Sequence, residues 1–160
     1  MVCLGNICRS PMAEVLVRAE LARAGLADRV SVESAGTGDW HVGGPMDRRA
    51  RAELVSRGYD GDSHRARQIS AAWLDRFDLL LAMDASNLRS LQRMAASRDG
   101  MTDRIRLFRS FDPGAPPGAQ VPDPYGGGPG EFAEVLDLIQ AAARGLVAAL
   151  AELLAERAGG

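Results

Sequence analysis

The sequence contains no lysine, so all 19 of its basic residues are arginine, and aromatic residues make up only 5% of it. The 21 acidic residues leave a net charge of −2. This balance provides no basic surface for nucleic acid and no polycationic face for anionic lipid. We therefore expect neither nucleic acid nor a membrane among its partners, and the missing lysine indicates a GC-rich genome more than a function.

Cysteine is also scarce. Cys3 and Cys8 are the only two cysteines, which is too few for a secreted disulfide scaffold or a four-ligand zinc site. The chain does not open with a basic region followed by an apolar run, and no apolar stretch approaches the ~20 residues of a membrane span. These absences favour a protein of the reducing cytoplasm.

Apolar periodicity alternates between helix and strand along the 160 residues. Helical patterns cover 11–25, 45–59, 84–97 and a C-terminal stretch of more than six turns, and strand patterns cover 29–36, 77–83 and 104–111. This alternation predicts a single α/β domain over residues 1–160: a doubly wound parallel four-stranded sheet with helices on both faces. Ligands of such sheets bind beyond the carboxyl ends of the strands.

The stretch VCLGNICRSP at residues 2–11 has the features of a phosphate-binding loop. We expect Val2 to end the first strand, Ser10 to cap the following helix and Pro11 to be its first residue. The loop therefore leads into a helix N-terminus, which has unpaired N–H groups and about half a positive charge. Gly5 and Asn6 tolerate unusual backbone angles, so that successive N–H groups can turn inward as an anion nest.

Two side chains of this loop carry the chemistry. Arg9 presents a planar fork that can hold two oxygens of a phosphate. All of the surrounding groups favour a thiolate at Cys3, which would be the nucleophile. A buried structural cysteine and an exposed arginine are the alternative, but Cys-x-Gly-Asn-x-Cys-Arg-Ser-Pro at a strand-to-helix junction favours the functional interpretation.

Residues 112–130 contain six of the eight prolines and six glycines. A loop this long in a compact domain is either disordered or functional, and composition alone does not choose between them. Asp123 lies between Pro122 and Pro124, which stiffen its backbone. A phenolate leaving group has a pKa near 10 and needs a proton, which an acid on such a loop can supply.

Aromatic residues are few enough for their positions to be informative. Trp40 lies in the glycine-flanked segment GDWHVGG, where an exposed indole is costly unless it has a function. With Tyr125 it would form the walls of a slot for a phenyl ring. Trp73 is expected in the core, and His41 is expected at the surface.

Five blocks in order resemble the low-molecular-weight protein tyrosine phosphatases: VCLGNICRSPMAE, SAGTGDWHVG, DSHRARQI, LLAMDASNL and DPYGG. The resemblance implies a flavodoxin-like fold of the phosphotyrosine phosphatase I type and hydrolysis of phosphotyrosine and aryl phosphates through a cysteinyl phosphate. It implies no cofactor and no metal. Its partners would be phosphotyrosine-containing proteins and a tyrosine kinase of the same pathway, and the protein would be a monomer or weak dimer.

The resemblance also assigns roles. Cys3 is the nucleophile, Arg9 the phosphate clamp and Asp123 the general acid. The remaining assignments are the phosphate-binding loop Leu4, Gly5, Asn6, Ile7, Cys8, Arg9 and Ser10; the loop-supporting residues Asn6, Ser10, Ser34 and His64; the substrate slot Trp40 and Tyr125; and a reversible Cys3–Cys8 disulfide that protects the nucleophile.

Three alternatives remain open at this point. Arsenate reductases of this fold need further cysteines and usually have Ser in place of Ile7 and Gln in place of Pro11. Protein-arginine phosphatases of the family typically have Thr in place of Ile7. A non-catalytic phosphate-binding module would suit a chain that lacks the acid or the nucleophile, and this chain has both.

The sequence departs from the family at the first strand, of which only Met1 and Val2 precede the cysteine. Family members have several more apolar residues there. We expect this strand to be truncated and to lie centrally in the sheet. Because its neighbours then lose ladder partners, we expect the protein to be unstable.

Overall fold

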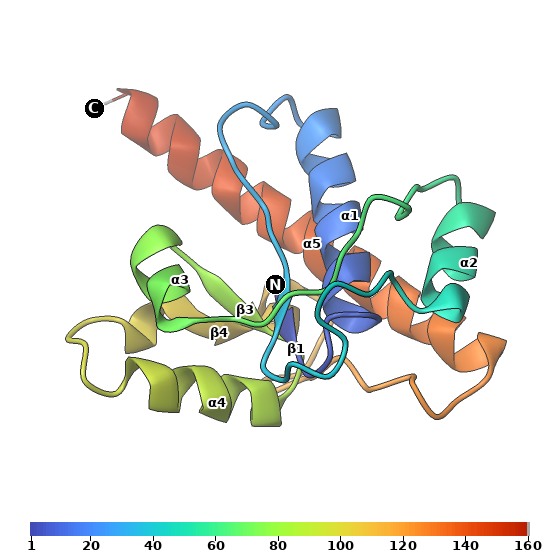
Figure 1. Ribbon diagram of the computed structural model, residues 1–160. Helices are drawn as coiled ribbons and strands as arrows, with labels where there is room; N and C mark the ends of the chain where they lie inside the picture. Colours follow the sequence, from blue (N-terminus) through green and yellow to red (C-terminus); the bar gives the residue numbers. More distant parts are fainter. Residues whose placement is uncertain (160) are drawn as a thin grey trace.

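The computed structural model describes residues 1–159, and its centre is a parallel sheet (Figure 1). The strands are β1 (Val2–Cys3), β2 (Ala35–Gly36), β3 (Leu80–Ala82) and β4 (Ile105–Leu107), in the order β2-β1-β3-β4. Val2 pairs with Ala35 on one side and with Ala82 on the other. The sequence correctly predicted the α/β class, the four parallel strands and the central position of the first strand.

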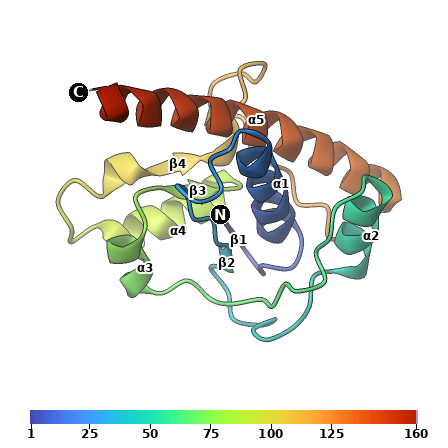
Figure 2. The ribbon, with the colours of Figure 1, turned by 90° about the horizontal axis from the view of Figure 1, so that it is seen from above.

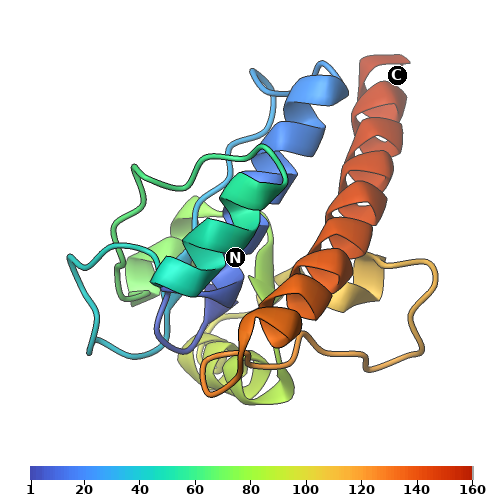
Figure 3. The ribbon, with the colours of Figure 1, turned by 90° about the vertical axis from the view of Figure 1, so that its right-hand side faces the viewer.

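Helices cover both faces of the sheet. They are α1 (Arg9–Arg23), α2 (Arg48–Ser56), α3 (Ala71–Arg76), α4 (Ala85–Ala95) and α5 (Pro129–Gly159), with short 3-10 helices η1 (Thr102–Arg104) and η2 (Phe108–Phe111). Helices α1 and α5 cover one face, with α2 packed beside them, and α3 and α4 cover the other (Figure 2). Figure 3 shows α1, α2 and α5 side by side.

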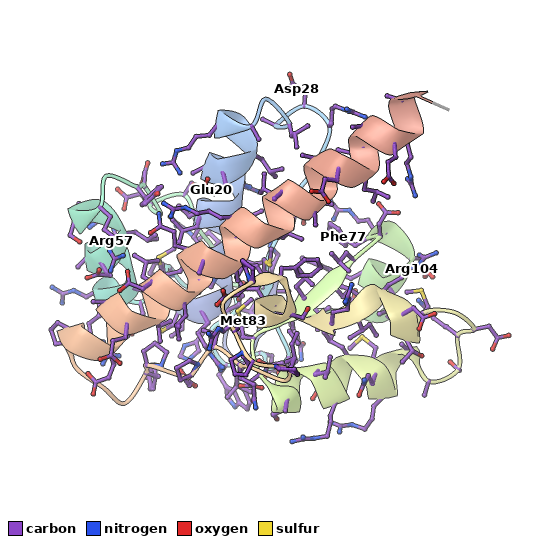
Figure 4. The ribbon with its side chains drawn as sticks, turned by 180° about the vertical axis from the view of Figure 1, so that it is seen from behind. Glu20, Asp28, Arg57, Phe77, Met83 and Arg104 are labelled. Atoms are coloured by element: carbon purple, nitrogen blue, oxygen red, sulfur yellow. The ribbon has the colours of Figure 1, made fainter. Side chains whose placement is uncertain are left out.

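Strand side chains alternate between the two layers, as the pleat requires. Val2, Leu80 and Ala82 pack in the core under α3 and α4. Cys3 and Leu81 point the other way, into the core under α1 and α5. Figure 4 shows this second face, with α5 crossing in front of the sheet and Met83 labelled where β3 ends. The side chain of the candidate nucleophile, Cys3, therefore lies on the face of the sheet that α1 covers.

The strands expected over 29–36, 77–83 and 104–111 are all shorter in the structure, and of residues 77–83 only Leu80–Ala82 form β3. Of residues 29–36 only Ala35–Gly36 pair in the sheet, because their partner β1 consists of Val2–Cys3 alone. Of residues 104–111 only Ile105–Leu107 form β4, and the chain then turns into η2. The apolar pattern continued past the last ladder partner in each case, so it overestimated the strands.

The helix boundaries also needed correction. The expected helix 45–59 begins at Arg48, because the carboxylate of Asp47 caps it by accepting the N–H of Arg49 at 2.8 Å. The expected helix 11–25 ends at Arg23, and Gly25 follows with φ of 68°. Helix α3 was not predicted, and its six residues are too few for a clear period. Trp73 on this helix is only partly buried against the core.

Helix α5 corrects another expectation. Its 31 residues include an 18-residue stretch of mean hydropathy 1.6, so by length and composition alone it could cross a membrane. Its buried residues nevertheless belong to the core beside α1: Phe132, Val135, Leu136, Ile139, Ala142, Ala143, Leu146 and Val147. Ion pairs from Arg144 to Glu20 and from Arg57 to Asp137 tie α5 to α1 and to the end of α2. Figure 4 labels Glu20 on α1 and Arg57 at the end of α2.

Gly145 tests how closely α5 approaches η2. A Cβ atom at Gly145 would lie 1.8 Å from the carbonyl oxygen of Phe111, so an added methyl group forces the backbones apart. Gly145→Ala should lower the free energy of unfolding by about 1–3 kcal/mol, although alanine normally stabilises a helix relative to glycine. Gly130→Ala, on the same helix with open space around it, is the control. Urea denaturation of both variants measures the difference, and a stabilised Gly145→Ala would contradict the packing.

Candidate active site

The carboxyl ends of the strands bring together segments that are far apart in the chain. Beyond the end of β1, the N–H groups of Thr37 and Gly38 donate to the carbonyls of Cys3 and Leu4 at 2.9 Å. Beyond β3, the carbonyl of Met83 accepts the N–H of Val121 at 2.8 Å. The first loop, the Trp40 segment and the proline-rich segment therefore meet at the point where the sheet order reverses, as predicted.

The loop from Cys3 to Arg9 curls around the Cys3 sulfur. Asn6 has φ of 55°, a left-handed conformation that asparagine tolerates better than most residues. This turn aims the Asn6 N–H at the Cys3 Sγ, at 3.3 Å. Gly36 packs beneath the loop so closely that a Cβ atom there would lie 2.6 Å from the Leu4 carbonyl oxygen. The loop shape thus depends on Asn6 and on a glycine of β2.

Ser10 does not cap the helix. Helix α1 begins at Arg9, and Cys8 is its N-cap residue, without a side-chain capping bond. The Ser10 hydroxyl instead lies 3.0 Å from the Cys3 Sγ. Its oxygen accepts an N–H of the Asn6 amide at 2.8 Å, and its hydroxyl hydrogen has two acceptors within reach, the sulfur and, farther away, the Ala35 carbonyl oxygen at 3.4 Å. The sequence assigned this contact correctly by resemblance and the cap incorrectly.

The buried Asn6 side chain is fully hydrogen-bonded. Its Nδ2 donates to Ser34 Oγ at 2.9 Å as well as to Ser10. Its Oδ1 accepts the N–H of Arg67 at 2.9 Å. His64 Nε2 lies 2.7 Å from the Asn6 carbonyl oxygen, and burial lowers the pKa of His64, which favours a neutral ring that donates this bond. The expected supporting residues thus surround Asn6.

Glu14 extends this network, and the sequence analysis missed it. Its carboxylate is buried and accepts the Ser34 hydroxyl at 2.5 Å, and it pairs with Arg18 at 2.7 Å. The only signal in the sequence is an acidic residue in the same helical turn as the buried Met12 and Ala13, which periodicity does not distinguish from a surface glutamate.

Arg9 carries a buried charge, with 3% of its side chain exposed. Its Nη1 donates to Asp84 Oδ2 at 2.6 Å and to the Val121 carbonyl at 3.1 Å. Its Nη2 lies 3.4 Å from Asp123 Oδ2. The guanidinium is therefore fixed by groups from two other segments and faces the candidate acid.

Asp84 is a second residue that sequence reasoning did not identify. It caps α4 by accepting the N–H of Asn87 at 2.8 Å, while its other oxygen accepts from Arg9. Burial opposes its charge, but the bonds from Arg9 and Asn87 outweigh burial and lower the pKa of this carboxyl. Asp84 is therefore an anion that orients Arg9. An aspartate between an apolar strand and a helix was the available signal.

The proline-rich segment follows a defined path. Val121 is fully buried and anchors the segment to Met83. Asp123 follows with 47% of its side chain exposed, and its Oδ1 accepts the Tyr125 N–H at 3.2 Å. Gly127 N–H then donates to the Pro124 carbonyl at 2.9 Å. Of the two interpretations of this composition, the structure agrees with an ordered loop.

A cleft of about 160 Å³ joins the candidate residues. Its lining consists of Cys3, Leu4, Gly5, Ile7, Cys8, Arg9, Trp40, His41, Asp123 and Tyr125. The sulfur, the guanidinium and the carboxylate thus share one cavity. Within residues 1–159, no group of three or more His, Cys, Asp or Glu side chains is placed to hold a metal ion.

Two aromatic side chains stand at the mouth of the cleft. Trp40 and Tyr125 line it while 70% and 53% of them remain exposed. His41 is only half-buried rather than free in solvent, because its ring packs against Gly5 and faces Tyr125 with ring centroids 6.5 Å apart. His41 therefore also lines the cleft, although only surface exposure was expected for it.

Both cysteines are buried free thiols. Burial raises the pKa of Cys8, with the negative charge of Asp47 contributing in the same direction. Cys8 is therefore a neutral thiol, while the sulfur of Cys3 faces hydrogen-bond donors.

Comparison with known proteins agrees with this site. Residues 1–156 match the family described as "Low molecular weight phosphotyrosine protein phosphatase". The chain is 48% identical over 159 residues to a Streptomyces coelicolor low molecular weight protein-tyrosine-phosphatase, covering 98% of this chain and 95% of that protein.

Solved structures agree as well. The crystal structure of YfkJ from Bacillus subtilis superposes with a TM-score of 0.86 at 40% identity, covering 94% of this chain and 92% of that one. A protein tyrosine phosphatase from Entamoeba histolytica gives 0.88 at 34% identity, covering 94% of both chains. The chain belongs to the low molecular weight protein tyrosine phosphatase family.

Proposed function

We propose that this phosphatase cleaves phosphotyrosine and other aryl phosphates through a phosphocysteine intermediate on Cys3. One observation carries the proposal: the Cys3 sulfur, the buried Arg9 guanidinium and the Asp123 carboxylate line the same cleft. A nucleophile, an anion clamp and a proton donor are the three groups that transfer of a phosphoryl group to sulfur requires. The match over residues 1–156 supports one catalytic domain.

The first step divides the work among these groups. N–H groups of the loop from Leu4 to Ser10 and the fork of Arg9 hold the phosphate oxygens. The Cys3 thiolate attacks phosphorus, and the S–P bond forms as the P–O bond to the aryl group breaks. Asp123 gives its proton to the departing phenolate oxygen. Asn6, Ser10, Ser34 and His64 keep the loop in shape, as their mutual hydrogen bonds support.

The second step hydrolyses the phosphocysteine and regenerates the free enzyme. The Asp123 carboxylate takes a proton from water, the water oxygen attacks phosphorus, and the S–P bond breaks to release phosphate and the thiolate. Ser10 donates to the sulfur in both steps, since its hydroxyl lies 3.0 Å away. Asp84 orients Arg9 through the 2.6 Å bond. This chemistry requires no metal and no cofactor.

The aromatic mouth selects the substrate. A phenyl ring between Trp40 and Tyr125 brings the phosphate to Cys3 at the base of the cleft, supported by the exposure of both rings along its rim. A phosphoserine ester is too short to reach the sulfur from the same rim. Phosphotyrosine-containing proteins are therefore the proposed substrates.

The cellular setting follows from the thiol chemistry. A reactive cysteine persists best in the reducing cytoplasm, where we place the enzyme. A tyrosine kinase of the same pathway would supply the substrates, and the protein would act as a monomer or weak dimer.

Replacing the nucleophile tests the central claim. Cys3→Ser should abolish hydrolysis of p-nitrophenyl phosphate while inorganic phosphate still binds, because Arg9 and the loop N–H groups remain. Steady-state rates and calorimetric titration with phosphate measure the two properties. Phosphoserine, phosphoarginine and arsenate are the comparison substrates, and a faster rate on any of them than on phosphotyrosine would refute the proposal. Phosphate binding by a wild-type protein without hydrolytic activity would identify a binding module instead.

The role of Asp123 is tested by the leaving group. Asp123→Ala should lower turnover by about 10²–10⁴-fold, the usual contribution of a general acid. Phosphotyrosine, with a phenolate pKa near 10, should lose more than p-nitrophenyl phosphate, whose leaving group scarcely needs a proton. Equal losses on the two substrates would mean that Asp123 only stiffens its loop.

Oxidation tests the proposed pair of Cys3 and Cys8, which line the same cleft. Peroxide should convert the Cys3 thiolate to a sulfenic acid, and the Cys8 thiol should then displace water to form the disulfide. In Cys8→Ala the sulfenic acid has no such partner, and peroxide oxidises it further to the sulfinic acid, which dithiothreitol does not reduce. Dithiothreitol should therefore restore the activity of peroxide-treated wild type but not of treated Cys8→Ala. Mass spectrometry of the oxidised protein should show the loss of two hydrogens, and similar recovery in both proteins would exclude the disulfide.

A further inference from the structure

Arg49 does not line the cleft, but it connects the loop that carries Asp123 to the N-terminal end of α2. It is the second residue of α2, and its Nη1 donates to the Gly127 carbonyl at 3.0 Å. Its Nε and Nη2 donate to the Asp47 carboxylate at 3.1 and 3.0 Å. One planar guanidinium thus holds a helix cap and the loop that carries Asp123.

The same guanidinium lies against two aromatic rings. Its central carbon is 5.5 Å from the centroid of Tyr125 and 4.8 Å from that of Phe132, within the range of cation–π attraction. Tyr125 lies two residues after the candidate acid, and Phe132 is buried in the first turns of α5. Arg49 therefore contacts the loop at Tyr125 and Gly127, and it contacts α5, the helix that follows the loop, at Phe132.

Asp47 links this arrangement to the phosphate-binding loop. Its N–H donates to the Ile7 carbonyl at 2.8 Å, and its carboxylate is bound by Arg49. Burial opposes the charge of Asp47, but the bonds from Arg49 lower its pKa, so it is an anion. A continuous path of contacts therefore runs from Ile7 through Asp47 and Arg49 to Gly127.

The loop that carries Asp123 depends on Arg49 only on the C-terminal side of Asp123. On the N-terminal side of Asp123, the buried Val121 is bonded to Met83 and Arg9. On the C-terminal side, residues 126–128 are three glycines with no side chains to pack. The Gly127–Pro124 bond there is internal to the loop. The Gly128 N–H also donates to the Glu131 carboxylate at 2.7 Å, which ties the glycines to the start of α5. Arg49 is the residue that ties this side to α2 and, through Asp47, to the phosphate-binding loop.

We propose that Arg49 is a positioning residue that holds Asp123 and Tyr125 over the phosphate-binding loop, an inference that rests on the proposed function of Asp123. It touches no reacting atom. Its loss should disturb proton donation to the leaving group and leave the thiolate and the phosphate clamp in place.

The kinetic test compares Arg49→Ala with Arg48→Ala. Arg48 is its neighbour on α2, and it is exposed. Arg49→Ala should lower kcat/KM for phenyl phosphate about tenfold, below the full contribution of a general acid. The value for p-nitrophenyl phosphate should change much less, and Arg48→Ala should change neither.

Two further variants separate positioning from stability. Arg49→Lys should restore only part of the rate, because an ammonium cannot bond Asp47 and Gly127 in one plane. In the Asp123→Ala background, Arg49→Ala should have no further effect on phenyl phosphate. Equal losses on both substrates, or a full loss on top of Asp123→Ala, would overturn the proposal.

Amide hydrogen exchange supplies a readout that does not need activity. Exchange at residues 123–128 should speed up in Arg49→Ala, while Arg48→Ala and the core amides of β3 stay as in wild type. Unchanged exchange in this segment would refute the anchoring role even in an active enzyme. Faster exchange in a protein without aryl phosphatase activity would uphold the anchor and reject the proposed function instead.

Discussion

The positive charge of Arg9, buried at the carboxyl edge of the sheet, is the constraint on which the site depends. A guanidinium removed from water is costly unless its N–H groups find anionic or carbonyl partners. Its partners are the Asp84 carboxylate after β3 and the Val121 carbonyl in the proline-rich segment. Satisfying this charge therefore requires three distant segments to meet beside Cys3. In the proposed function, the same positive charge attracts the phosphate dianion of the substrate into the cleft.

The two segments beside Arg9, the phosphate-binding loop and the segment of Asp123, are held in place to different degrees. The phosphate-binding loop holds a left-handed residue, Asn6, whose every side-chain donor and acceptor is bonded within the protein. A strained backbone of this kind persists only where its surroundings over-determine it. The segment of Asp123 is held instead by Val121 on one side and by Arg49 and Glu131 on the other. Such a division suits a reaction in which the anion site stays fixed and the acid reaches an exposed leaving group.

Whether a site residue could be predicted from the sequence depends on how far away in the chain its interaction partners lie. Cys3 and Arg9 were found because the loop between them is continuous in sequence, and its shape follows from local residue types. Glu14, Asp84 and Arg49 were missed because each acts through a partner 20 or more positions away, which only folding brings near. Ser10 was misassigned as a cap because a serine before a proline satisfies the local rule, while the Cys3 sulfur competes for its hydroxyl.

By itself, the sequence determined the α/β class, the central first strand and the position of the candidate phosphate-binding loop with Cys3 at the carboxyl edge of the sheet. Period, turn chemistry and helix-start signals are local, and they all agree in this chain. Only the tertiary structure decided how far each strand pairs, which carboxylate orients Arg9 and what holds Asp123 in place. Strand length depends on where a partner strand runs, and a buried charge is satisfied by whichever side chain reaches it across the sheet edge. Such long-range contacts leave no period in the sequence, so they become visible only once the chain is folded.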